Sequence, residues 1–357
     1  MNRPFVEKSL RNLPVIILLC FLFLLYGYFL VHKIDLTTAD LGRHIKNGEV
    51  LLAEAADERG RKTQIDADTE RADLSVLRTN FYSYTHPDFP VINHHWGSGV
   101  LFYLSWRLGG FVGVHLFFIA LSLAAFAAFL FAARRFAGWG IVGLVALFLL
   151  PLLAERTEIR PEVFSYLFAG LFFLILSRQD IVFTYDRKQI LVFGGWDWAL
   201  PVIQVIWVNT HIYFLLGPLL VGAFLLESLL QRRADFFRLL GVLGAVLAAT
   251  FVNPFGYRAI TEAITLFQNF GYRLAENQSV WFLERLGMSN PNFLIFKTAL
   301  VMLALSYVWV LLKSRSSFRL AHFSIAVGMS VLAAFSVRNL ALFGLFLIPL
   351  LAENIVA

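Results

Sequence analysis

Residues 13–31 read LPVIILLCFLFLLYGYFLV, a stretch without a single charged side chain. An α-helix of about 20 apolar residues spans a hydrocarbon core of roughly 30 Å. Similar apolar runs recur along the whole chain, which is 59% hydrophobic and 15% charged with a mean hydropathy of +0.70. A soluble core of 357 residues cannot bury so much apolar surface. The sequence therefore predicts an all-α, polytopic integral membrane bundle of about ten spans. These are residues 13–31, 111–133, 138–153, 162–178, 198–211, 213–231, 237–254, 293–312, 318–336 and 339–353.

Basic residues predict which side of the membrane each connection faces. Lys and Arg in short connections resist translocation and stay on the cytoplasmic side. With ten spans, the strongly basic connections all fall on the side of the N-terminus. They carry Arg134 and Arg135, Arg178 with Arg187 and Lys188, Arg232, Arg233 and Arg238, and Lys313, Arg315 and Arg319. We therefore expect a multi-pass protein of the bacterial inner membrane with a cytoplasmic N-terminus. No small-residue cleavage site follows the first span, so we expect it to remain as an anchor.

The charge and the cysteine content narrow the function classes. A net charge of +6 is explained by cytoplasmic basic residues beside anionic lipid, and we expect no nucleic-acid partner. The single cysteine, Cys20, lies inside the first span. It provides neither a disulfide framework nor a thiolate metal cluster.

The predicted spans divide the chain into three parts. Residues 1–31 are the cytoplasmic N-terminus and the first span, and residues 32–110 form a large extracytoplasmic loop. Residues 111–357 form the rest of the bundle, with a second external segment near 255–292. Within the large loop, Ala39–Ala56 has the pattern of an amphipathic helix on the membrane surface.

The remainder of the large loop contains a highly charged run and, further along, a short predicted helix. The run Ala55–Asp73 is dense in charge and predicts a solvated excursion without a core. Val100–Leu108 predicts a short interfacial helix that ends at Gly109-Gly110, before the second span.

Ionisable residues gather near helix ends on the outer side. Arginines there oppose the usual charge bias, and binding of a phosphate would explain them. The alternative is that Arg156 and Arg160 pair with Glu155, Glu158 or Glu162. The sequence leaves both interpretations open.

A series of short motifs runs through these outer segments. In order along the chain they are Asp40 to His44 with Gly48-Glu49, Arg78 to Thr85, Asn93 to Trp96, Arg160 to Glu162, Trp207 to His211, Asn253 to Gly256, and Arg338-Asn339. With one span followed by a large external loop that opens on an Asp, the arrangement resembles the GT-C class of glycosyltransferases, which use polyprenyl-phosphate-linked sugars. It is similar in particular to a branch of bacterial membrane proteins with the same order of motifs. Here His95 occupies a position where many members of that branch carry Glu.

The resemblance implies a GT-C-like fold and a role for each outer residue. Asp40 would be the general base that takes the proton of an acceptor hydroxyl, and His44 would orient Asp40 or the phosphate. The leaving lipid phosphate needs positive or hydrogen-bonding partners. The candidates for lipid-phosphate or substrate binding are His94, His95, Arg156, Arg160, Glu162, His211, Arg258 and Arg338. The implied partners are a polyprenyl-phosphate-linked sugar, membrane lipids and an acceptor of unspecified class.

Some of these residues have other interpretations. His94 and His95 in a loop could both ligate a divalent metal, with Asp40 or His44 completing the site. His211, like His115, could instead be a polar residue that hydrogen-bonds to neighbouring helices. His322 is expected near the cytoplasmic end of the ninth span.

Two other functions are alternatives to glycosyl transfer. A transporter or flippase of a lipid-linked or anionic substrate is the first, although the predicted spans are nearly free of charge at their middles and show no clear repeat. A non-catalytic scaffold is the second, and it leaves the outer arginines to chance pairing.

Overall fold

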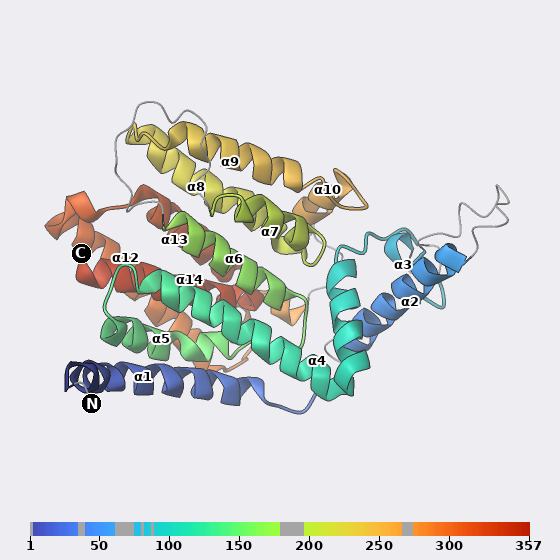
Figure 1. Ribbon diagram of the computed structural model, residues 1–357, viewed down its shortest axis with the longest axis horizontal. Helices are drawn as coiled ribbons and strands as arrows, with labels where there is room; N and C mark the ends of the chain where they lie inside the picture. Colours follow the sequence, from blue (N-terminus) through green and yellow to red (C-terminus); the bar gives the residue numbers. More distant parts are fainter. Residues whose placement is uncertain are drawn as a thin grey trace.

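The computed structural model describes residues 3–34, 40–60, 75–79, 82–86, 89–178, 196–265 and 274–357, and these contain helices but no strand (Figure 1). The α-helices are α1 (Arg3–Leu30), α2 (Leu41–Gly60), α3 (Ser75–Arg78), α4 (Trp96–Ala133), α5 (Trp139–Leu153), α6 (Glu162–Leu176), α7 (Ala199–Val208), α8 (Leu216–Leu230), α9 (Phe236–Ala249), α10 (Arg258–Thr265), α11 (Val280–Arg285), α12 (Pro291–Lys313), α13 (Leu320–Phe335) and α14 (Leu340–Val356). The 3-10 helices are η3 (Ile212–Leu215), η4 (Ala275–Asn277), η5 (Arg315–Ser317) and η6 (Val337–Asn339).

The all-α prediction is confirmed, since each of the ten apolar segments contains a helix. Five helical segments of the described part are long and apolar enough to cross a membrane: α1, α4, η3 with α8, α12, and η6 with α14. The apolar helices α5, α6, α7, α9 and α13 have only 10 to 17 residues. The predicted charged run 55–73 lies largely outside the described residues, which resume at Ser75.

The helix α14 forms the centre of the bundle. Every side chain from Leu340 to Ala352 is buried, and the helix contacts α4, α5, α12 and α13. A helix that is apolar on all sides is buried on all sides. The peripheral helix α1 instead exposes 74% of Leu24 and 75% of Tyr28. Such large exposed apolar side chains suit an outer surface in contact with lipid tails.

A break divides α4 into the two helices that the sequence predicts. Gly109 and Gly110 have non-helical backbone angles, with φ +59° and ψ −150° at Gly110. Side chains other than hydrogen are strongly disfavoured at those angles. The first part of α4 therefore turns away from the bundle and supports α2, as Figure 1 shows.

Two glycines allow α2 to lie directly on α4. A Cβ atom added to Gly48 would lie 2.2 Å from the carbonyl oxygen of Gly99. One added to Gly99 would lie 2.8 Å from the carbonyl oxygen of His44. Because the two backbones meet here, the position of His44 depends on this contact.

The two ends of the bundle differ. Both chain termini lie at one end, where the connections α4–α5, α8–α9 and α12–α13 also turn back (Figure 1). The helices α2, α3 and α10 and the α5–α6 connection lie at the opposite end. We call this opposite end the polar end.

Candidate functional site

Two of the sequence motifs lie side by side at the polar end. The Val91 amide donates a hydrogen bond to the Arg78 carbonyl at 2.9 Å. The Asn93 amide donates to the Leu77 carbonyl at 3.0 Å. These bonds hold the segment that leads to His94 against the end of α3, so Arg78 and the motif at 93–96 lie close together.

Asn209 fixes this surface to the bundle. Its side-chain oxygen accepts a hydrogen bond from the Trp96 indole at 3.0 Å, and its carbonyl accepts one from the Gly97 amide at 2.9 Å. Its side-chain amide nitrogen donates a hydrogen bond to the Val252 carbonyl at 2.8 Å, and Val252 lies just after α9. A Cβ atom on Gly97 would lie 2.5 Å from the Asn209 carbonyl oxygen, so only glycine permits this approach. The motifs at 93–96 and 207–211 therefore meet through Asn209.

Four predicted site residues form one histidine cluster. The ring centroid of His95 lies 4.1 Å from that of His94 and 5.3 Å from that of His211. The centroid of His44 lies 5.5 Å from that of His95. The structure thus brings together imidazoles from α2, from the loop before α4 and from the turn after α7.

His211 also forms the hydrogen bond to a neighbouring helix that its alternative interpretation requires. The Trp207 indole donates to the Ser165 hydroxyl oxygen at 2.7 Å, and the Ser165 hydroxyl then donates to His211 Nδ1 at 2.6 Å. A neutral imidazole that accepts at Nδ1 carries its hydrogen on Nε2. His115 lies apart from the cluster, with its Nε2 2.8 Å from the Leu30 carbonyl oxygen of α1.

Burial keeps the histidine cluster uncharged. Desolvation, followed by the charge of Arg43, lowers the pKa of His44 to about 3. Desolvation lowers the pKa of His94 to about 4, although its hydrogen bond to the Ile92 carbonyl acts in the opposite direction. Desolvation and the neighbouring histidines hold the pKa of His95 well below its usual value. These rings are therefore neutral at pH 7.

The tautomer of His94 limits what it can bind. Its Nδ1 lies 3.0 Å from the Ile92 carbonyl oxygen and must donate to it. The neutral ring then presents only an acceptor at Nε2. It suits a hydroxyl group rather than a phosphate oxygen.

The metal site considered from the sequence is not formed in the described part of the chain. No group of three or more His, Cys, Asp or Glu side chains there is arranged to hold a metal ion. Asp40 is exposed at the start of α2, with φ +53°, and its carbonyl accepts the His44 amide hydrogen. Among the described residues, no partner contacts its carboxylate.

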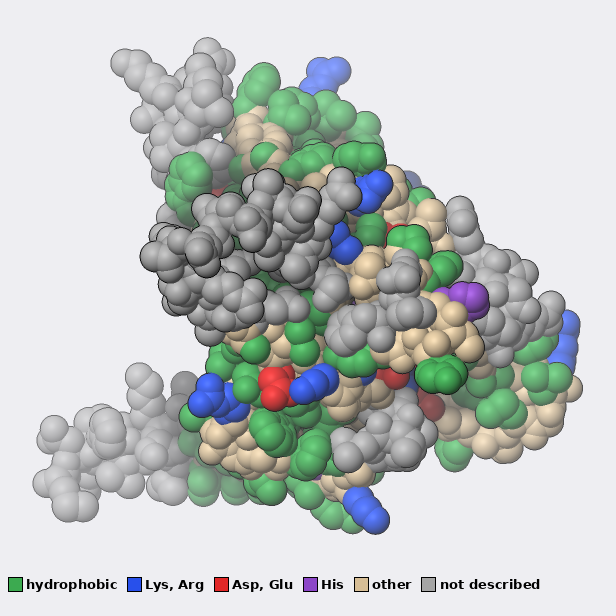
Figure 2. All heavy atoms as spheres, turned by 90° about the vertical axis from the view of Figure 1, so that its right-hand side faces the viewer, with side chains coloured by type: hydrophobic (Ala, Val, Ile, Leu, Met, Phe, Trp, Pro, Cys, Tyr) green, Lys and Arg blue, Asp and Glu red, His purple; other side chains and the backbone are tan. Residues whose placement is uncertain are grey.

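A cavity of about 870 Å³ opens beside the histidine cluster. Its walls come from α2, the end of α3, the 89–95 loop and the 254–262 segment, and they include both His94 and His95. A volume of this order is typical of small-molecule sites. Figure 2 looks onto this end of the molecule, where charged side chains lie between wide hydrophobic and uncharged areas.

Three arginines line this cavity, which we call the arginine cavity. Arg43 lies on α2, Arg78 ends α3, and Arg258 begins α10. All three are exposed, and none forms an ion pair with a carboxylate among the described residues. Glu262, one helical turn after Arg258, is the acidic residue on the described part of the wall.

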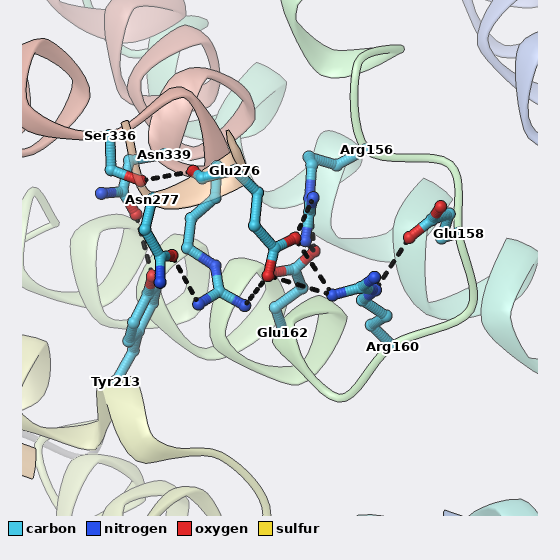
Figure 3. A network of polar contacts seen from close by, with 10 residues as sticks. Arg156, Glu158, Arg160, Glu162, Tyr213, Glu276, Asn277, Ser336 and Asn339 are labelled. Atoms are coloured by element: carbon cyan, nitrogen blue, oxygen red, sulfur yellow. Dashed lines mark hydrogen bonds and ion pairs between the residues drawn. The ribbon is translucent and has the colours of Figure 1, made fainter. Parts of the chain in front are cut away.

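The other predicted arginines have carboxylate partners (Figure 3). Arg156, Arg160 and Arg338 all contact Glu276, at 3.2, 3.1 and 3.4 Å. Arg156 also pairs with Glu162 at 2.7 Å. We call these five residues the Glu276 network.

Pairing in the Glu276 network shifts the ionisation of its members. Burial alone would raise the pKa of Glu276, but the positive charges of Arg338, Arg160 and Arg156 outweigh it and lower that pKa. Burial disfavours the charged form of Arg156, yet Glu162 and Glu276 raise its pKa overall. The Glu276 carboxylate is thus held ionised against the guanidiniums.

The pairing alternative therefore describes Arg156 and Arg160. Of its three expected acids, Glu162 pairs with Arg156 and Glu158 with Arg160, and Glu276 is an additional partner of both arginines. Arg160 pairs with Glu158 at 2.8 Å as well as with Glu276. Glu155 instead accepts hydrogen bonds from two asparagines, Asn290 and Asn292, at the start of α12.

Sequence reasoning missed Arg43, Arg78 and Glu262 on the cavity wall and Glu276 as the shared acceptor. Arg43 lies between the predicted residues Asp40 and His44, and Arg78 opens a quoted motif, so their positions carried a signal. Arg258 and Glu262 are spaced to share one helix face. Nothing in the sequence links Glu276 to arginines more than 100 residues away.

Comparisons of this chain with protein-family models, with curated proteins and with solved structures find no match.

Proposed function

We propose that this chain is an integral membrane glycosyltransferase of GT-C type that moves a sugar from a polyprenyl-phosphate donor to an acceptor outside the cytoplasm. The observation that carries the proposal is the meeting of distant motifs beside one cavity, at one end of a bundle of apolar helices. An enzyme for lipid-linked sugars needs such a site, because the phosphate lies at the level of the headgroups while the tail stays in the bilayer.

In the proposed reaction, the acceptor hydroxyl loses its proton to the Asp40 carboxylate as its oxygen bonds to the anomeric carbon. The bond from that carbon to the phosphate oxygen breaks, and the lipid phosphate leaves with the electron pair. Asp40 precedes Arg43 by three residues, and Arg43 lines the cavity. Asp40 itself is not among the residues that line the cavity, so the proposal requires its exposed carboxylate to meet the acceptor at the cavity mouth.

In this proposal, different side chains of the cavity bind different parts of the substrate. Arg258 is positively charged and suits the departing phosphate. His94, with its acceptor at Nε2, suits a sugar hydroxyl. The remaining predicted phosphate ligands, Arg156, Arg160 and Arg338, already contact Glu276, and their role in the proposal is to hold the polar end together.

We also propose that all ten apolar helices cross the bacterial inner membrane, with the N-terminus in the cytoplasm and the polar end outside. The support is that basic residues such as Arg134, Arg233 and Lys313 lie in connections at the end of the bundle that holds the termini (Figure 1). Positive charge in short connections favours the cytoplasmic side.

The test uses the purified full-length protein in lipid nanodiscs with a panel of polyprenyl-phosphate sugars and acceptors. We expect release of free polyprenyl phosphate, and we expect Asp40→Asn to abolish it while leaving the thermal unfolding temperature unchanged. Glu49→Gln is the matched control, because Glu49 is an acid on the same helix that pairs at the surface with Lys46.

Several outcomes would contradict the proposal. Movement of an intact lipid-linked substrate across the bilayer without bond cleavage would show a flippase or transporter. Equal activity of Asp40→Asn and the unmodified protein would show that Asp40 is not the general base. Absence of release with every donor would reject glycosyl transfer.

A further inference from the structure

We infer that the arginine cavity binds a phosphate-bearing group through Arg43, Arg78 and Arg258. The inference rests on the proposed function in that it treats the cavity as the substrate site, yet its test needs no turnover. Two of these residues, Arg43 and Arg78, lie within sequence motifs but are not among the candidate site residues predicted from them.

The first step of the argument is the contrast in pairing. Every arginine of the Glu276 network contacts at least one carboxylate, whereas Arg43, Arg78 and Arg258 contact none among the described residues. All three nevertheless line one cavity. Like charges held around a shared space repel one another, and an anion between them removes that cost.

The second step is the balance of charge. Among the described residues of the cavity wall, three arginines stand against one carboxylate, that of Glu262, and His94 and His95 are neutral at pH 7. This part of the wall therefore has an excess of two positive charges. A phosphate monoester or a diphosphate carries a matching negative charge at this pH.

The third step is geometry. The three guanidiniums come from three separate elements, α2, α3 and α10, and therefore approach the cavity from different walls. A carboxylate is satisfied by one bidentate arginine, whereas a phosphate offers several oxygens that point in different directions. Arginines on separate walls consequently favour phosphate.

The fourth step concerns the source of the phosphate. The walls belong to the segments around α2, α3 and α10 rather than to the long apolar helices. The cavity can therefore take either the head group of a lipid-linked substrate or a soluble phosphate ester.

The experiment measures binding of inorganic pyrophosphate to the full-length protein in nanodiscs by calorimetry. We expect Arg43→Gln, Arg78→Gln and Arg258→Gln each to weaken binding about ten- to a hundredfold, since a hydrogen bond to a charged group is lost. Glu262→Gln should tighten binding by removing repulsion. Arg107→Gln is the matched control, because Arg107 is exposed on α4 and does not line the cavity.

Competition identifies the source. Displacement of pyrophosphate by a short-chain prenyl phosphate, but not by a hexose phosphate, supports a lipid head group. The reverse pattern supports a soluble ester. The inference is overturned if pyrophosphate does not bind, or if the cavity variants weaken binding no more than Arg107→Gln. Binding without any glycosyl transfer would reject the proposed function alone.

Discussion

The arginine cavity and the Glu276 network lie at the same end of the bundle, and both contain arginines. The surroundings of these arginines differ. In the network, Arg156 and Arg160 are largely buried and share carboxylates with Glu162 and Glu276. In the cavity, three exposed arginines face open space without a carboxylate partner in the described part of the chain. The difference indicates that the network stabilises the fold. The positive charges of the cavity arginines are instead available to bind an anionic ligand.

The largest expected effect is that of Glu276→Gln, which tests whether the Glu276 network stabilises the fold. Three arginines would lose their shared counter-charge, and removing one partner of a partly buried ion pair leaves the other charge uncompensated. We expect a loss of about 2–4 kcal/mol in the free energy of unfolding, measured by denaturant titration in detergent. The matched control is Glu284→Gln, because Glu284 pairs with Lys297 at the surface. Equal stability of the two variants would show that the network is dispensable.

A second variant tests whether the cavity depends on the α2–α4 contact. Gly48→Ala places a methyl group against the backbone of Gly99 and should cost about 1–3 kcal/mol. It should also weaken pyrophosphate binding, because α2 carries Arg43. Gly42→Ala is the control on the same helix, since a Cβ atom there meets nothing within 4 Å. A cavity that binds normally in Gly48→Ala would contradict the dependence.

Acid should weaken the polar end more than the rest of the fold. His44, His94 and His95 have folded-state pKa values below the unfolded value near 6.5, so the unfolded chain binds more protons as the pH falls. Stability is fully present above about pH 6.5 and declines below it. We expect His94→Gln to remove roughly 1 kcal/mol of the loss between pH 7 and pH 5.5, measured by unfolding at both values. An unchanged pH profile in that variant would show that His94 does not titrate in this way.

The smallest effect on stability is expected from Arg258→Gln. Because the side chain is exposed and lacks a carboxylate partner among the described residues, unfolding should change by less than about 0.5 kcal/mol. The same variant should weaken pyrophosphate binding. A large loss of stability would place Arg258 with the network rather than with the ligand site.

Local patterns could be predicted from the sequence because they depend on neighbouring residues. The amphipathic helix expected at 39–56 is α2 at Leu41–Gly60, and the interfacial helix expected to end at Gly109 does so. Both features follow from residue spacing and from the backbone freedom of glycine.

Pairing and cavity formation could not be predicted, because they require contacts between distant segments. The arginines at 156 and 160 contact Glu276, whose sequence context resembles that of any external acid. Asp40 is exposed and has a left-handed backbone just before α2, and neither feature is indicated by the spacing of neighbouring residues. The motifs identified the histidines and Arg258 as candidates, but not Arg43 and Arg78, which line the cavity with Arg258.

The bend at Gly109-Gly110 has a mechanical consequence. Because α4 continues through it, the segment that carries His94 and His95 is joined to a bundle-crossing helix by backbone alone, with no loop between them. A rotation at these two glycines would therefore swing the start of α4 and the imidazoles before it as one unit, and the hydrogen bonds of Trp96 and Gly97 to Asn209 oppose that rotation.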